Sequence, residues 1–93
     1  MISTLPALVQ AFFTKRLFAQ LRASPHTISG YRDCFRLLLC FAEREIGKAP
    51  CDLMVEDLDA PFIGQFLEHL ETERGNGIRT RNARLAAIHS FFR

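Results

Sequence analysis

The stretch from Ser24 to Gly47 constrains the fold of this chain more than any other part of its sequence. Ser24 is a typical N-cap residue, and Pro25 follows at the first helical position, where the missing N–H of proline costs no hydrogen bond. Gly47 is typical of a residue that ends a helix in the left-handed conformation. Apolar residues recur three or four positions apart between these signals, at Ile28, Tyr31, Phe35, Leu38, Leu39, Ala42 and Ile46. The stretch therefore predicts one long amphipathic helix.

Three further segments show the same helical spacing. The first covers about residues 5–21, with Pro6 in its first turn. Another begins after the N-cap candidate Asp59 and ends before Gly75-Asn76-Gly77, and the last runs from about Ile78 to the chain end. Their apolar stripes are Leu5, Leu8, Val9, Phe12, Phe13, Leu17 and Leu21, then Phe62, Ile63, Phe66, Leu67 and Leu70, then Leu85, Ile88, Phe91 and Phe92.

The composition favours an all-α fold in a single domain spanning residues 1–93. Only 13 of the 93 residues are β-branched, whereas Leu alone contributes 12. Hydrophobic residues make up 48% and charged residues 24%, which excludes a disordered chain. We therefore predict an all-α bundle of four helices.

Neither a membrane segment nor a metal site is expected. No apolar run approaches the 18 residues of a membrane span, and the N-terminus lacks the features of a signal peptide. The cysteines are odd in number and form no CxxC, and the histidines match no metal-ligand spacing: Cys34, Cys40, Cys51, His26, His69 and His89. We expect a soluble, cytoplasmic protein with reduced cysteines, no metal, no cofactor and no membrane partner.

Charge is distributed unevenly although the net charge is only +2. Residues 1–42 carry +4, residues 43–73 carry −7, and residues 74–93 carry +5 with no acid. Ten of the twelve basic residues are Arg, which suits bidentate contacts to phosphate and guanine. This distribution indicates one basic face that could meet a polyanion, and an ordinary solvated helical surface remains an alternative.

No catalytic motif is present in the sequence. GxSxG, HExxH, P-loop and GxGxxG patterns are all missing. Tyr31 is the only tyrosine, and it lies in the apolar stripe of its helix, which favours a packing role. We therefore expect no catalysis by these 93 residues.

Two helices begin with similar residues. One starts Ser24-Pro25-His26-Thr27 and the other Gly77-Ile78-Arg79-Thr80. The free N–H groups at a helix N-terminus, together with a hydroxyl and a cation, can form a phosphate site. Threonine at this position is also a common capping variant, so ordinary helix capping remains an alternative.

The chain combines two loose motifs in a fixed order. They are Ser24-x-x-Thr27-x-x-x-Tyr31 and Thr80-x-Asn82-x-Arg84-Leu85-Ala86-Ala87-Ile88-x-x-Phe91-Phe92. Together they resemble the core-binding domain of tyrosine recombinases, which include phage integrases, and the resemblance spans about residues 5–93. It implies a SAM-like, orthogonal four-helix bundle that clamps one side of duplex DNA. A separate catalytic domain, which holds the catalytic residues of that family, would then follow residue 93.

The resemblance and the charge pattern together give a set of expected DNA contacts. Arg79, Arg81 and Arg84 would supply charge, although Arg81 falls toward the apolar side of its helix. Thr27 and Thr80 would bind phosphates, and Asn82 would read a base edge. Ser24, His26 and Arg32 complete the set.

The expected partners are duplex DNA, the catalytic domain of the parent chain and other recombinase protomers on DNA. The isolated fragment is expected to be a monomer. Two alternatives remain open from the sequence. One is a helical protein–protein interaction module, which exposure of Leu37 and Phe41 would favour. The other is a self-standing helix-turn-helix repressor, which would be a dimer.

Overall fold

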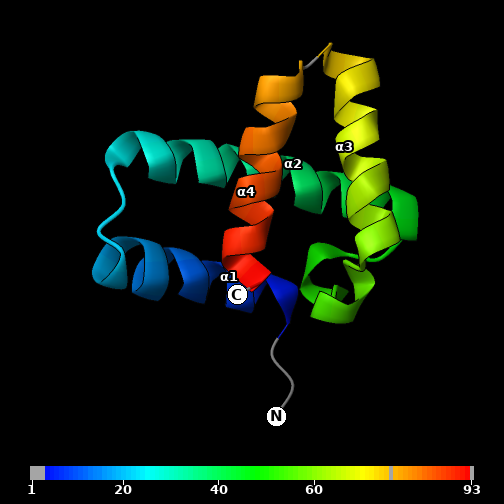
Figure 1. The fold of residues 1–93 in the computed structure, drawn as a ribbon. Helices are drawn as coiled ribbons and strands as arrows, with labels where there is room; N and C mark the ends of the chain where they lie inside the picture. The colour runs from blue at the N-terminus through cyan, green and yellow to red at the C-terminus, as the bar shows by residue number, and fades with distance from the viewer. Residues whose placement is uncertain (1–3, 76, 93) are drawn as a thin grey trace. The chain divides into compact units, whose positions relative to one another are not determined.

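The computed structural model describes residues 4–75 and 77–92. Its elements are α1 (Leu5–Ala11), the π-helix η1 (Phe12–Gln20), α2 (Pro25–Ile46), the short 3-10 turns η2 (Pro50–Asp52) and η3 (Val55–Asp57), α3 (Ala60–Arg74) and α4 (Ile78–Phe92) (Figure 1). No strand occurs among the residues described, and the predicted all-α class is confirmed. The chain divides into two compact units, residues 1–55 and 56–93.

The predicted ends of α2 are confirmed, and local chemistry accounts for both. Ser24 has extended backbone angles, and its Oγ accepts a hydrogen bond from the backbone N–H of Thr27 at 3.2 Å. A side-chain cap of this kind stabilises a helix by about 1 kcal/mol. Gly47 adopts φ +78°, a left-handed conformation that glycine reaches without steric strain.

Aromatic packing holds the first unit together. The ring of Phe35 on α2 lies 5.9 Å from the rings of both Phe12 and Phe13, which belong to η1. Tyr31 is half-buried and stacks on Phe12 with ring centroids 6.4 Å apart, so its predicted packing role is confirmed. Leu5, Val9, Phe12, Leu17, Cys34, Phe35, Leu38, Phe41, Ala42 and Leu53 are buried in this part of the chain.

The first helix keeps its predicted span but changes type halfway. After Ala11 it continues as a π-helix, and the N–H of Leu21 donates to the carbonyl of Arg16 at 2.7 Å, five residues back. This π-helix ends at Gln20, and Arg22, two residues later, has the left-handed φ of +50°. Leu21 lies just beyond the helix and is 58% exposed, so its predicted core position is wrong. Phe18 is 70% exposed.

The second unit is a helical hairpin in which α3 and α4 are joined by a short turn (Figure 1). Asp59 caps α3 through a 2.9 Å hydrogen bond from the N–H of Phe62, and Gly75 ends this helix at φ +65°. Leu58, Ile63, Phe66, Leu67, Leu70, Ala87 and Ile88 are buried. Phe92 is 43% exposed, which corrects its predicted place in the core. Asn76 of the predicted helix-breaking turn and the final Arg93 lie outside the described residues.

The described residues offer neither a membrane span nor a metal centre. None of their helices combines the length and the apolar character needed to cross a bilayer. Three or more metal-ligating side chains do not come together anywhere in the described part of the chain. Cys34 is buried, whereas Cys40 and Cys51 are exposed, and all three are free thiols.

Candidate nucleic-acid interface

The N-terminus of α2 brings together two of the hydroxyls that sequence analysis selected. Ser24 Oγ donates a 3.0 Å hydrogen bond to Thr27 Oγ1 and accepts one from the backbone N–H of Thr27. Ser24, His26 and Thr27 are all exposed. Because a hydroxyl can donate one hydrogen bond and accept two, Thr27 can still donate to an oxygen of a ligand. This end of the helix therefore offers an exposed polar pair whose geometry is fixed by the cap.

Beyond its first turn, α2 presents an open outer face. Gly30 is exposed, and a Cβ atom built there would meet nothing within 4 Å. Arg32 is exposed as well. Arg36 forms an ion pair within the helix: its Nη2 atom lies 2.7 Å from Oδ1 of Asp33, the one acid in residues 1–42. Because Gly30 has no side chain and no neighbouring atoms cover it, a ligand could approach the helix backbone at this position.

The first turns of α4 present most of the expected contact residues to solvent. Arg79, Thr80, Arg81 and Asn82 are exposed, as are the small residues Ala83 and Ala86. The opposite side of the helix is buried through Ala87 and Ile88. Charge, a hydroxyl and a carboxamide are thus displayed together on a helix anchored by its other face.

Arg84 departs from the exposed position expected of it. Its side chain is half-buried, and its Nε atom is inaccessible to solvent. The cause is the helical register, because Arg84 precedes Ala87 and Ile88 by three and four positions and so emerges beside the buried face. A half-buried side chain is only partly available to a ligand, so Arg84 is a less open contact than Arg79.

Arg81 has an acidic neighbour that sequence reasoning missed. Its Nη1 atom lies 3.1 Å from Oε1 of Glu71, in the last turn of α3. The basic segment contains no acid of its own, but the hairpin brings one to it from the preceding helix. The sequence does contain a feature that predicts this pair. Glu71 lies four residues before Gly75 and Arg81 lies four residues after Gly77, so a hairpin at these glycines would bring the two side chains to the same level.

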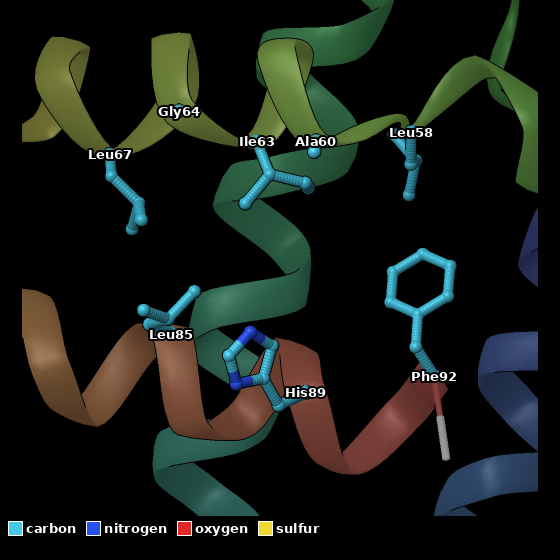
Figure 2. A pocket seen from close by; sticks show the side chains of 8 residues that line it. All are labelled: Leu58, Ala60, Ile63, Gly64, Leu67, Leu85, His89 and Phe92. Atoms are coloured by element: carbon cyan, nitrogen blue, oxygen red, sulfur yellow. The ribbon is translucent and has the colours of Figure 1, made fainter.

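An apolar hollow lies between α3 and α4 and has a volume of about 350 Å³ (Figure 2). Its lining consists of Leu58, Ala60, Ile63, Gly64, Leu67, Leu85, His89 and Phe92. In Figure 2 the His89 ring projects toward α3, among aliphatic side chains. His89 is the single titratable residue of this lining, and the other seven residues are apolar or glycine.

Comparison with known proteins identifies the family. Residues 10–93 match the family described as the N-terminal SAM-like domain of phage integrase. The chain belongs to this family. The resemblance inferred from the motifs at Ser24–Tyr31 and Thr80–Phe92 is thereby confirmed.

The SAM-like domain is also similar to two Sinorhizobium fredii proteins that are named as integrase/recombinases. It is 55% identical to y4rC over 91 residues, which cover 98% of this chain and 27% of y4rC. It is 48% identical to y4rD over 88 residues, which cover 95% of this chain and 31% of y4rD. The chain thus spans less than a third of either relative. No solved structure matches it.

Proposed function

We propose that this SAM-like domain binds duplex DNA as the N-terminal half of a recombinase clamp that serves DNA integration and recombination. The observation that carries the proposal is the start of α4, where Arg79, Thr80 and Asn82 are exposed on a helix buried through its opposite side. Family membership and the +5 charge of residues 74–93 support it. A DNA substrate also agrees with the cytoplasmic location expected from the sequence.

Each proposed contact has a chemical role. Arg79 and, in part, Arg81 and Arg84 attract phosphates, and Thr80 donates a hydrogen bond to a phosphate oxygen. Asn82 can pair with two positions of an adenine edge in the major groove. On α2, the paired hydroxyls of Ser24 and Thr27 would hold a phosphate at the helix N-terminus, and His26 and Arg32 would add contacts beside it.

DNA cleavage belongs to a different part of the parent protein under this proposal. The relatives are more than three times as long as this chain, which leaves room for the catalytic domain that we expect as a partner. Incubation of the domain with supercoiled plasmid should therefore give neither nicked circles nor a covalent protein–DNA adduct. An adduct on Tyr31 would contradict both this expectation and the stacked position of that ring on Phe12.

A salt titration tests the proposed function directly. Fluorescence anisotropy with a labelled duplex should show weak binding with little sequence preference. Half a clamp makes about four to six phosphate contacts, so log K should fall with log salt at a slope of about −4 to −5. No binding at low salt, or an affinity that does not depend on salt, would contradict the proposal.

The interaction-module alternative loses the feature that was expected to favour it. Phe41 is buried and Leu37 is half-buried, so neither supplies an exposed apolar surface.

Phe18 and Leu21 do project into solvent at the end of η1. We propose that such apolar side chains serve contacts with other recombinase protomers once DNA brings these together, and that the isolated domain is a monomer. Light scattering after size exclusion tests the second point, since a repressor-like dimer would have twice the mass.

A further inference from the structure

The hairpin of α3 and α4 places one acidic side chain inside the proposed DNA-binding surface. We propose that Glu71 neutralises Arg81 and thereby limits how many phosphates the start of α4 engages. This inference rests on the proposed function, because it concerns the strength of DNA binding by the same surface. It makes Glu71 a residue that sets affinity without touching DNA.

The geometry keeps the two side chains close together. Nη1 of Arg81 lies 3.1 Å from Oε1 of Glu71, and their side chains are 44% and 34% exposed. Backbone hydrogen bonds fix the helix ends on both sides of the turn. The N–H of Gly75 donates to the carbonyl of Glu71 at 3.1 Å, and the N–H of Arg81 donates to the carbonyl of Gly77 at 3.0 Å. The ion pair therefore spans a turn whose two ends are already ordered.

The surrounding charges make this one acid consequential. Arg74, at the end of α3, and Arg79, in the first turn of α4, are both exposed basic residues. Glu71 forms an ion pair with Arg81, which belongs to the same basic segment. A cation that keeps a carboxylate partner neutralises a phosphate less completely and releases fewer counterions from DNA. Arg79 should therefore count fully toward the salt dependence of binding, whereas Arg81 should count only in part.

Glu73 provides a matched control on the same helix. It carries the same charge two positions further on, which turns it about 200° around the helix axis from Glu71. Its side chain is exposed. Removal of either acid raises the net charge by the same amount, so any difference between the two variants reports the pairing with Arg81. Gln is the chosen replacement because it keeps the shape of Glu and can still accept a hydrogen bond from Arg81.

The experiment measures duplex binding by anisotropy at several salt concentrations. The proteins compared are the wild type, Glu71→Gln, Glu73→Gln, Arg79→Ala, Arg81→Ala and the double variant Glu71→Gln/Arg81→Ala. Glu71→Gln should steepen the salt slope by up to about 0.9 and tighten binding up to about eightfold near 0.1 M salt. Glu73→Gln should tighten binding much less and leave the slope unchanged. Arg81→Ala should lower the slope by less than Arg79→Ala does, and it should abolish the gain in the Glu71→Gln background. Thermal melts verify that each variant is folded.

The outcomes separate this inference from the function on which it rests. Equal gains in Glu71→Gln and Glu73→Gln would overturn the inference, because binding would then follow overall charge. An Arg81→Ala variant that loses as much slope as Arg79→Ala would also overturn it, since Arg81 would then neutralise a phosphate fully despite its pairing with Glu71. In both cases the wild-type chain still binds. A wild-type chain that fails to bind at low salt contradicts the proposed function itself, and this inference fails with it.

Discussion

The N-termini of α2 and α4 share a sequence signature but are built differently. At α2 the hydroxyl of Ser24 caps the helix and bonds to the hydroxyl of Thr27, so the groups proposed to bind DNA also hold the fold. At α4 the preceding residue is Gly77, which has no side chain to act as a cap, and Arg79 and Thr80 are exposed. Substitutions at α2 should therefore change stability and binding together, whereas at α4 the two should separate.

The largest expected effect on binding is that of Arg79→Ala. The substitution removes one phosphate contact, so the magnitude of the salt slope should fall by about 0.9, and the affinity near 0.1 M salt by about eightfold. The melting temperature should stay close to that of the wild type, because exposed side chains away from special features change stability by less than about 0.5 kcal/mol. Anisotropy with a labelled duplex, together with thermal melts, measures both quantities.

Arg44→Ala is the control for Arg79→Ala. Arg44 is exposed near the end of α2, with its Nε atom 3.9 Å from Oε1 of Glu45 and its guanidinium 5.8 Å from the ring of Phe41. Its loss should leave the affinity and the salt slope nearly unchanged, although the lost ring contact can lower stability by about 0.5–1 kcal/mol. If Arg44→Ala weakens binding as much as Arg79→Ala, attraction to DNA is diffuse and α4 has no special role.

Removal of one hydroxyl at each helix N-terminus should lower stability at α2 and weaken DNA binding at α4. Ser24→Ala removes the cap of α2 and should lower the free energy of unfolding by about 1 kcal/mol. For a domain of this size the melting temperature should then fall by about 4–8 °C. Thr80→Ala is the matched hydroxyl deletion at α4, and it should weaken DNA binding about fivefold through the loss of one neutral hydrogen bond, with an unchanged salt slope. Equal losses of stability in the two variants would show that both helices depend on side-chain caps.

Gly30→Ala has the smallest expected effect on binding, and it should raise stability while it weakens binding. Gly30 lies one turn after His26 and Thr27 on an open face, so Gly30→Ala should stabilise α2 by about 1 kcal/mol. The new methyl group should nevertheless weaken DNA binding, by less than Arg79→Ala does, if the DNA backbone approaches this patch. Thermal melts and anisotropy report the two effects separately. A variant that is more stable and binds as well as the wild type would remove Gly30 from the proposed interface.

Features set by local chemistry could be predicted from the sequence. The start and end of α2, the cap at Asp59 and the stop at Gly75 each depend on one side chain or one backbone conformation, and all four were confirmed. The π-helical form of residues 12–20 could not be predicted from the apolar spacing, which assumes α-helical turns. Leu21 was expected in the core because its spacing continues the apolar stripe, but it lies just beyond the last helical residue, Gln20, and is exposed.

Features of the candidate site that depend on how helices face each other were harder to predict. The half-buried position of Arg84 depends on which face of α4 is turned inward. The predicted apolar stripe did not fix that face, because it included Leu85, which is half-buried, and Phe92, which is exposed. The pairing of Arg81 with Glu71 joins residues ten positions apart and exists only once the hairpin has formed. The contact residues expected for DNA, such as Asn82, remain predictions that the proposed binding experiments can test.

The hydrogen bond from the N–H of Leu5 to the carbonyl of Leu53 has a practical consequence for handling this protein. It joins the first helical residue to the connector after α2 and closes residues 5–53 into a loop, and both leucines are fully buried. The family match begins only at residue 10, so an expression clone trimmed to the matched range would lack Leu5 and the buried Val9. The connector would then lose its anchor, and its amide protons should exchange with solvent far faster.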